Sequence, residues 1–242
     1  SSDVCSSDLA VVLRHGPDPV RAVFSPDGSN VLTMSGNYGT NGAAIWEAAT
    51  GRRRFVFPHG PVIFDANFDP TGRWVVTGGS DYCARVWDAQ TGRELLPPLR
   101  HDHANDGPGY GNIFDARFSP DAQRIVTTGE DQEIRLWAVS DHRLLLPPLR
   151  CDERAHCSLF SPDGTRLAVA GLRASVLLDG RTLARIASLS TNREWVHVLQ
   201  FSRDGRRIAI AASTRSSRAR RNFFRRLAPT KLMMRFWRTT LL

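Results

Sequence analysis

The chain has 242 residues, of which 41% are hydrophobic and 23% are charged, and its formal net charge is +8. This length and composition allow one sizeable domain and exclude gross disorder. No apolar run approaches the roughly 20 residues that cross a bilayer, and no signal peptide is recognisable, so we expect a cytoplasmic protein without a membrane partner.

The first residues of the chain match none of the later segments. Residues 1–8 are therefore expected to be a non-native or disordered leader. Residues 9–13 form the first predicted strand. This strand stands alone before the first repeat.

One sequence motif then recurs along residues 9–212. A phenylalanine is followed by Ser-Pro-Asp-Gly or a close variant, and the successive phenylalanines are 44, 50, 42 and 41 residues apart. The five copies begin at Phe24, Phe68, Phe118, Phe160 and Phe201. A second landmark is an apolar residue followed by tryptophan, at Trp46, Trp87 and Trp137, which degrades to leucine at Leu178. Five copies in phase indicate a repeat architecture.

Each copy is predicted to form four short strands. In the second copy these are residues 62–68, 74–77, 84–87 and 94–99. The Ser-Pro-Asp-Gly phrase favours a turn, because proline fixes φ, aspartate bonds back to the backbone and glycine tolerates a positive φ. The fourth strand holds two adjacent prolines, which fit only an edge strand. Four strands in about 40 residues are the unit of a propeller blade.

This pattern resembles the WD-repeat β-propellers, and the resemblance covers about residues 9–212. It implies an all-β fold of four blades plus a partial fifth, because no third strand with its tryptophan follows residues 208–212. We therefore expect an incomplete propeller, either an open arc or a strained small ring. The proline-rich fourth strands are most similar to bacterial members, which implies a fragment of a larger bacterial signalling protein.

In that family a tryptophan, a strand hydroxyl, a histidine and a turn aspartate form a hydrogen-bonded network inside a blade. The second copy has the complete set, which is His59, Thr77, Asp81 and Trp87. The first copy has only His15, Thr33 and Trp46, and the third has Thr127, Asp131 and Trp137 with its histidine displaced. The fourth copy, with Val169 and Leu178, has lost the network, so its blade should be weaker.

The same residues argue against catalysis. His59, Thr77 and Asp81 could suggest a nucleophilic triad, but an active site has no reason to recur every 40 residues or so. No phosphate-binding or dinucleotide-binding motif is present. The sparse cysteines miss the zinc spacings, so neither a metal site nor a disulfide framework is predicted. We therefore expect no enzyme, no cofactor and no small-molecule substrate.

The expected function is a protein–protein interaction scaffold. Extra residues fall within residues 37–42 and 102–112, in two loop types that share one face of such a propeller, called the top face below. Insertions confined to one face indicate binding there. The family's partner contacts flank the start of each first strand, and the flanking residues chosen here are Arg154, His156, Trp195, His197, Phe64 and Phe114. The two phenylalanines could equally be core residues in adjacent blades.

The C-terminal end departs from the repeat. Residues 213–242 contain nine cations and no acids, which leaves 23 cations against 24 acids in residues 1–212. We expect a basic tail that is disordered or frame-shifted. Its mixture of arginines and aromatic residues carries the alternative function, binding to nucleic acid or another acidic surface.

Overall fold

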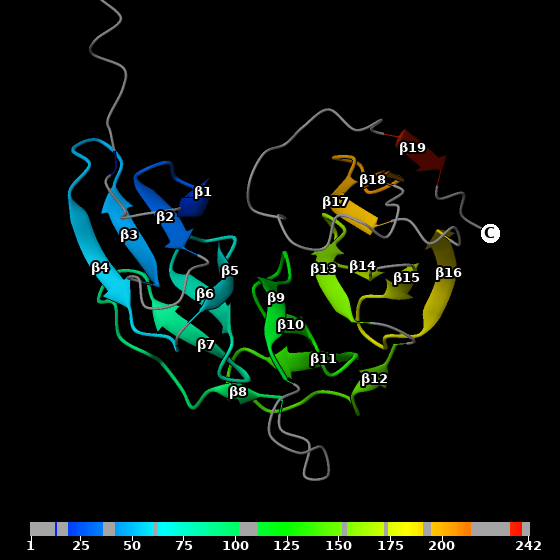
Figure 1. The fold of residues 1–242 in the computed structure, drawn as a ribbon, viewed down its shortest axis with the longest axis horizontal. Helices are drawn as coiled ribbons and strands as arrows, with labels where there is room; N and C mark the ends of the chain where they lie inside the picture. Colours follow the sequence, from blue (N-terminus) through cyan, green and yellow to red (C-terminus); the bar gives the residue numbers. More distant parts are fainter. Residues whose placement is uncertain are drawn as a thin grey trace, which may run out of the picture.

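Five antiparallel sheets stand side by side around an arc (Figure 1). The structure is a computed structural model, and it describes residue 13 and residues 19–35, 42–60, 62–101, 111–151, 154–171, 174–190, 195–213 and 233–238. Within these residues all regular structure is β-strand, as predicted. The described part of the chain holds no helix of a length and apolarity suited to crossing a membrane.

Each sheet is built from consecutive strands. The first contains β1 (Pro19–Phe24), β2 (Asn30–Ser35), β3 (Ala43–Glu47) and β4 (Arg53–Phe57). The second contains β5 (Ile63–Phe68), β6 (Trp74–Gly79), β7 (Cys83–Asp88) and β8 (Leu99–Arg100). The third contains β9 (Ile113–Phe118), β10 (Arg124–Gly129), β11 (Glu133–Ala138) and β12 (Leu149–Arg150). The fourth contains β13 (Ala155–Phe160), β14 (Arg166–Gly171), β15 (Ser175–Asp179) and β16 (Arg185–Ser190).

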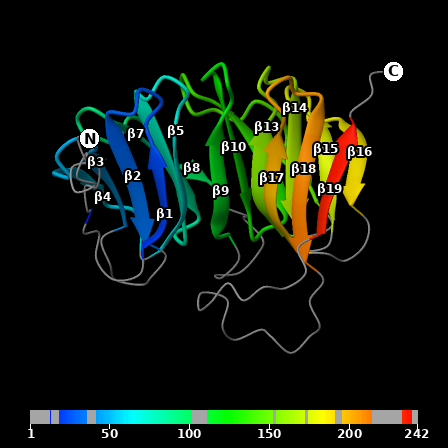
Figure 2. The same cartoon turned by 90° about the horizontal axis from the view of Figure 1, so that it is seen from above.

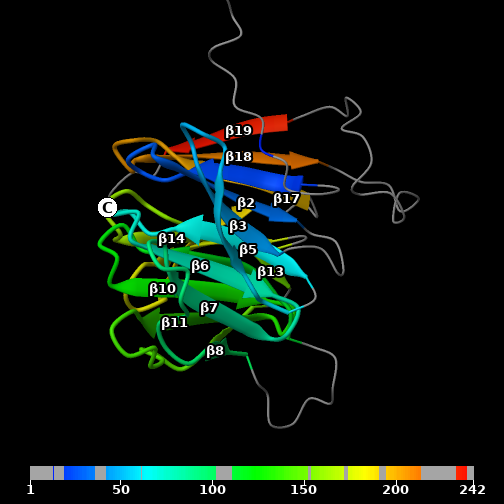
Figure 3. The same ribbon diagram turned by 90° about the vertical axis from the view of Figure 1, so that its left-hand side faces the viewer.

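The fifth sheet contains β17 (Trp195–Phe201), β18 (Arg207–Ser213) and β19 (Met233–Arg238). β19 lies beside β18 (Figure 3) and places Trp237 opposite Ile208, the register in which Trp87 lies opposite Val75. The expectation that no third strand follows was therefore wrong, and part of the predicted tail is a strand. Residues 1–8 and the rest of the tail lie outside the described residues, so the domain boundaries stay a prediction.

The predicted turns and edge strands account for the shape of each sheet. Glycines of the repeated turn have φ near +70°, as at Gly28 (+72°) and Gly72 (+74°), and the third copy forces Ala122 to +55°. The fourth strands of the second and third sheets are shorter than predicted. Their prolines remove ladder donors, so regular pairing is limited to β8 and β12 and to single bridges such as Trp87 with Glu94.

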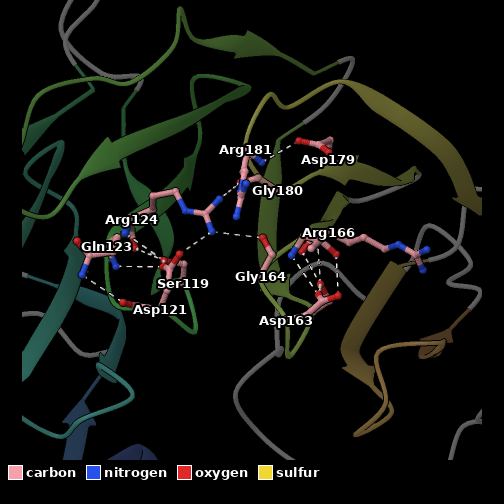
Figure 4. A network of polar contacts seen from close by, with 12 residues as sticks. Ser119, Asp121, Gln123, Arg124, Asp163, Gly164, Arg166, Asp179, Gly180 and Arg181 are labelled. Carbon is pink, nitrogen blue, oxygen red and sulfur yellow. Dashed lines mark hydrogen bonds and ion pairs between the residues drawn. The ribbon is translucent and has the colours of Figure 1, made fainter.

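The arc is held together by packing between neighbouring sheets. The strands run between the same two faces of the molecule (Figure 2), and apolar side chains of each sheet pack against the next. On the face of the repeated turns, Arg124 spans two sheets (Figure 4). Its Nη1 donates to Gly180 O (2.5 Å), its Nη2 donates to Gly164 O (3.3 Å), and its guanidinium lies over the Phe160 ring.

The sheets do not close into a ring. β1 and β17 belong to the two end sheets of the arc (Figure 1). Phe24 in β1 is 65% exposed, whereas its counterparts Phe118 and Phe160 are 8% and 6% exposed because a preceding sheet covers them. Of the two predicted arrangements, the open arc is therefore confirmed, and the small closed ring was wrong.

Candidate functional site

The second sheet contains the complete hydrogen-bonded network. Trp87 Nε1 donates to Thr77 Oγ1 (2.8 Å), and Thr77 Oγ1 lies 2.5 Å from His59 Nδ1. With the hydroxyl donating to Nδ1, the proton of His59 Nε2 is directed at Asp81 Oδ1 and Cys83 O, each 3.0 Å away. The imidazole thus fixes the linker from the first sheet against the second.

The charge of Asp81 is stabilised in this setting. Burial alone raises the pKa of the carboxyl, but the hydrogen bond from His59 and the Arg85 guanidinium outweigh it and lower the pKa to about 2. Asp81 is therefore ionised at neutral pH. A carboxylate held by two partners is a structural anchor and is poorly suited to act as a general base.

The third sheet contains the same network, completed by a histidine that sequence reasoning missed. His101 Nε2 lies 2.6 Å from Thr127 Oγ1, and its Nδ1 lies 2.9 Å from Asp131 Oδ2. Trp137 Nε1 donates to Thr127 Oγ1 (2.8 Å). Burial lowers the pKa of His101 despite its bond to Asp131. The inserted residues hide this histidine, but its place directly after Leu-Pro-Pro-Leu-Arg was a usable signal.

The remaining sheets carry less of the network. In the first, Trp46 Nε1 donates to Thr33 Oγ1 (2.6 Å), and His15 lies outside the described residues. In the fourth, Val169 and Leu178 are buried apolar residues. Thr77 and Thr127 are both 0% exposed, so neither hydroxyl can reach a substrate. These sets are parts of the frame, and nothing in their geometry supports catalysis.

The predicted partner residues lie where the first strands begin. The pairing of β5 with β6 skips Phe64 between Ile63 and Asp65, and the equivalent irregularities place bulges at Phe114, His156 and His197. A bulge turns a side chain away from the regular alternation and is common beside functional sites. Four of the six predicted residues are therefore bulge residues, which the repeat alone does not reveal.

The structure brings some of these residues together. The Phe64 and Phe114 rings meet edge to face at 5.2 Å, so both contribute to packing between the second and third sheets. His156 Nε2 donates to Val196 O (2.8 Å) of the fifth sheet. Trp195 and His197 are placed in β17, but their side chains are not among those described. Binding by these residues stays a prediction.

Arg154 shows that the two loop types meet on one face. Its Nη1 lies 2.8 Å from Glu130 Oε1, and its side chain is 43% exposed. Glu130 lies between β10 and β11 and also accepts from Asn112 Nδ2 (2.8 Å) of the linker before β9. The top face thus joins linkers and second-to-third-strand turns. Most of the inserted segments, residues 37–41 and 102–110, lie outside the described residues.

The inner strands carry two buried carboxylates that sequence reasoning missed. Asp65 Oδ2 accepts from the Ala116 amide (3.3 Å), and Asp115 Oδ2 accepts from the Ser158 amide (3.0 Å), so each carboxylate bonds to the next sheet. Arg21 Nη1 lies 2.5 Å from Asp65 Oδ1. The repeated Phe-Asp-Ala at residues 64–66 and 114–116 was the available signal.

Burial controls the charge of this inner cluster. Burial, and then the neighbouring Asp115, raise the pKa of Asp65 to about 6, although Arg117 and Arg21 oppose them. Burial and Asp115 also raise the pKa of the Cys157 thiol to about 12. Among the described residues, no three His, Cys, Asp or Glu side chains are placed to hold a metal ion.

Comparison with known proteins follows the same repeat. Residues 51–88 and 103–138 match the WD40 family model, the WD domain or G-beta repeat. The chain is 30% identical over 105 residues to eukaryotic translation initiation factor 3 subunit I of Kluyveromyces lactis, covering 40% of this chain and 29% of that protein. It is 49% identical over 39 residues to a ribosome biogenesis protein of Mycosarcoma maydis, covering 16% of this chain and 4% of that protein.

These matches span less than a third of either relative. The two segments that match the family model end at Asp88 and Ala138, the last residues of β7 and β11, directly after the tryptophans of the two complete networks. Sequence and geometry therefore agree that the chain contains WD40 repeats, arranged as blades of an open propeller.

Proposed function

We propose that the chain is a non-catalytic scaffold that binds protein partners on its top face. The observation that carries this proposal is the series of bulges at the starts of the first strands, at Phe64, Phe114, His156 and His197. The buried networks hold the strands behind them in place. A rigid frame with irregular positions along one face suits recognition of another protein.

The relatives support the same class of function. One is named as a subunit of a translation initiation factor and the other as a ribosome biogenesis protein. We infer that this chain likewise works within a multi-protein assembly, in the cytoplasm. Membership of a bacterial signalling protein rests on the proline-rich fourth strands alone, and both relatives reported above are eukaryotic.

Site-specific photocrosslinking tests the proposed face. A photoreactive residue at Arg154, which precedes β13, is compared with one at Arg181, an exposed arginine in the turn between β15 and β16 of the same blade (Figure 4). This turn bonds through Gly180 N to Thr165 O, in the turn that follows β13, so it lies on the face opposite to Arg154. The proposal expects a discrete protein adduct from position 154 alone. Adducts from position 181 alone, or from neither position, would overturn it.

The identified partner then allows affinities to be measured with purified proteins. Arg154→Ala and His156→Ala should each weaken binding by roughly 1–3 kcal/mol, with Arg181→Ala as the matched control. Binding through the basic tail is the competing function. It predicts an affinity that falls steeply with salt and disappears when residues 213–242 are removed.

A further inference from the structure

A cavity of about 190 Å³ lies between β12 of the third blade, which contributes Leu149 and Arg150, and the strands of the fourth blade. Cys151, Val169 and Leu178 line it. Leu178 lies opposite Leu167 in the register in which Trp87 lies opposite Val75, so it occupies the tryptophan position of this blade. The cavity therefore lies where the complete blades hold their networks.

The correspondence extends to the histidine and the threonine. Cys151 directly follows Leu149–Arg150, as His101 directly follows Leu99–Arg100, and Val169 stands at the position of Thr77 and Thr127. A leucine in place of an indole and a thiol in place of an imidazole remove side-chain volume, and a neighbourhood of packed strands relaxes only partly to refill it.

A glycine at the end of the second strand supports the same correspondence between the cavity and the network. In the second blade a Cβ added to Gly79 would lie 2.8 Å from His59 Nε2, so the imidazole covers that glycine. Its counterpart in the fourth blade, Gly171, lines the cavity instead. The space is thus the place that an aromatic pair fills elsewhere in this molecule.

The rim of the cavity differs in charge from the same place in the second blade. There, Arg85 Nε lies 3.4 Å from Glu94 Oε1. In the fourth blade Val176 replaces the arginine and Arg185 replaces the glutamate, and both line the cavity. Arg185 is exposed and donates from Nη2 to Ser188 Oγ (2.6 Å), which leaves its other guanidinium N–H groups available to a ligand.

We propose that this cavity binds a flat apolar aromatic ring whose attached carboxylate reaches Arg185. In another protein, an engineered apolar cavity of about 150 Å³ binds benzene. Val169 offers no hydroxyl to accept an N–H, so a phenyl ring suits the walls at least as well as an indole. A guanidinium at the rim binds a carboxylate well because its donors match the two oxygens.

Thermal unfolding with added toluene or phenylacetate tests the site. A ligand that binds only the folded chain raises its melting temperature in a concentration-dependent way. Both probes should raise the melting temperature of the wild type. Neither probe should change the melting temperature of Leu178→Trp, because the indole fills the cavity. Arg185→Gln should lose the response to phenylacetate but keep that to toluene, whereas Arg181→Gln should keep both. No shift in the wild type, or equal shifts in Leu178→Trp, would overturn the proposal.

Alkylation of Cys151 gives a second measurement that needs no cavity-filling variant. It uses a Cys5→Ser chain, because Cys83 is 1% exposed and the raised pKa of Cys157 makes it a poor nucleophile. Phenylacetate should slow the alkylation, and unchanged rates would contradict the site. The aromatic ring and carboxylate can belong to a partner protein or to a free aromatic acid, and a short peptide with phenylalanine beside aspartate distinguishes these two ligands. If the peptide protects Cys151 from alkylation more strongly than phenylacetate does, the ligand is a partner protein. If the peptide protects Cys151 less strongly, the ligand is a free aromatic acid.

Discussion

Single buried hydroxyls hold the blade networks together. Thr77 Oγ1 accepts from Trp87 and contacts His59, so Thr77→Val leaves an indole N–H and an imidazole nitrogen without that partner. We expect the free energy of unfolding to fall by about 2–4 kcal/mol, as measured by urea denaturation. The reverse change in the fourth blade, Val169→Thr, should bring no gain because no indole is there to bond. An effect of Thr77→Val below about 0.5 kcal/mol would contradict the role assigned to the network.

Asp65 predicts a distinct pH dependence. Its pKa in the folded chain is raised from 3.8 to about 6, so between these values the folded state binds more protons than the unfolded state. The free energy of unfolding contributed by this group therefore falls as pH rises from 4 to 6, by at most about 1.4 kcal/mol per pH unit. Asp65→Asn removes this slope. Denaturation at several pH values should show the free energy of unfolding of the variant rising relative to that of the wild type between pH 4 and 6. A difference between the two that stays constant with pH would refute the assignment.

At the level of the element, one turn is strained by its residue. Ala122 has a φ of +55° at the position that Gly28, Gly72, Gly164 and Gly205 occupy in the other copies. Ala122→Gly should relieve this strain and raise the free energy of unfolding by up to about 1 kcal/mol, net of the greater freedom of glycine in the unfolded chain. Gly28→Ala is the matched control, because an added Cβ there meets no atom within 4 Å. Gly28→Ala should lower the free energy of unfolding by a similar amount, through backbone strain alone. If Ala122→Gly and Gly28→Ala do not change the free energy of unfolding in opposite directions, this account is contradicted.

The strands and their turns were predictable because the repeat encodes them locally. Turn residues defined the inner three strands of the second blade, the repeat carried the same pattern to the other copies, and the paired prolines marked the edge strands of the second and third blades. Features that depend on distance along the chain were missed. His101 is separated from its blade by an insertion, and β19 follows 19 residues that lie outside the described part of the chain. The bulges and the blade-to-blade bonds of Asp65 depend on how sheets stack, which no local pattern reports.

At the level of the whole molecule, the arc combines strong and weak junctions. The first three blades each have a tryptophan bonded to a buried threonine, and carboxylates on the inner strands bond each of the second and third sheets to the next. The fourth blade has Val169 and Leu178 in place of that pair, and both line the cavity at its junction with the third blade. Stability in stacked repeats is roughly the sum of each unit and its interfaces. Unfolding should therefore begin at the fourth and fifth blades, which hydrogen exchange would detect as faster exchange in β14 and β18 than in β6 and β10.

The open end of the arc predicts self-association. Phe24 is 65% exposed at the position where the preceding blade covers Phe118 and Phe160, so the first blade presents apolar surface that a second molecule can cover. Phe24→Ser should lower the weight-average mass in sedimentation measurements at high protein concentration and leave the melting temperature within a few degrees of the wild type. Phe160→Ser, a change of the same chemistry at a buried site, should instead destabilise the fold by about 3–5 kcal/mol. If the wild type is monomeric at every concentration, or if Phe24→Ser associates as strongly, then this surface does not drive association.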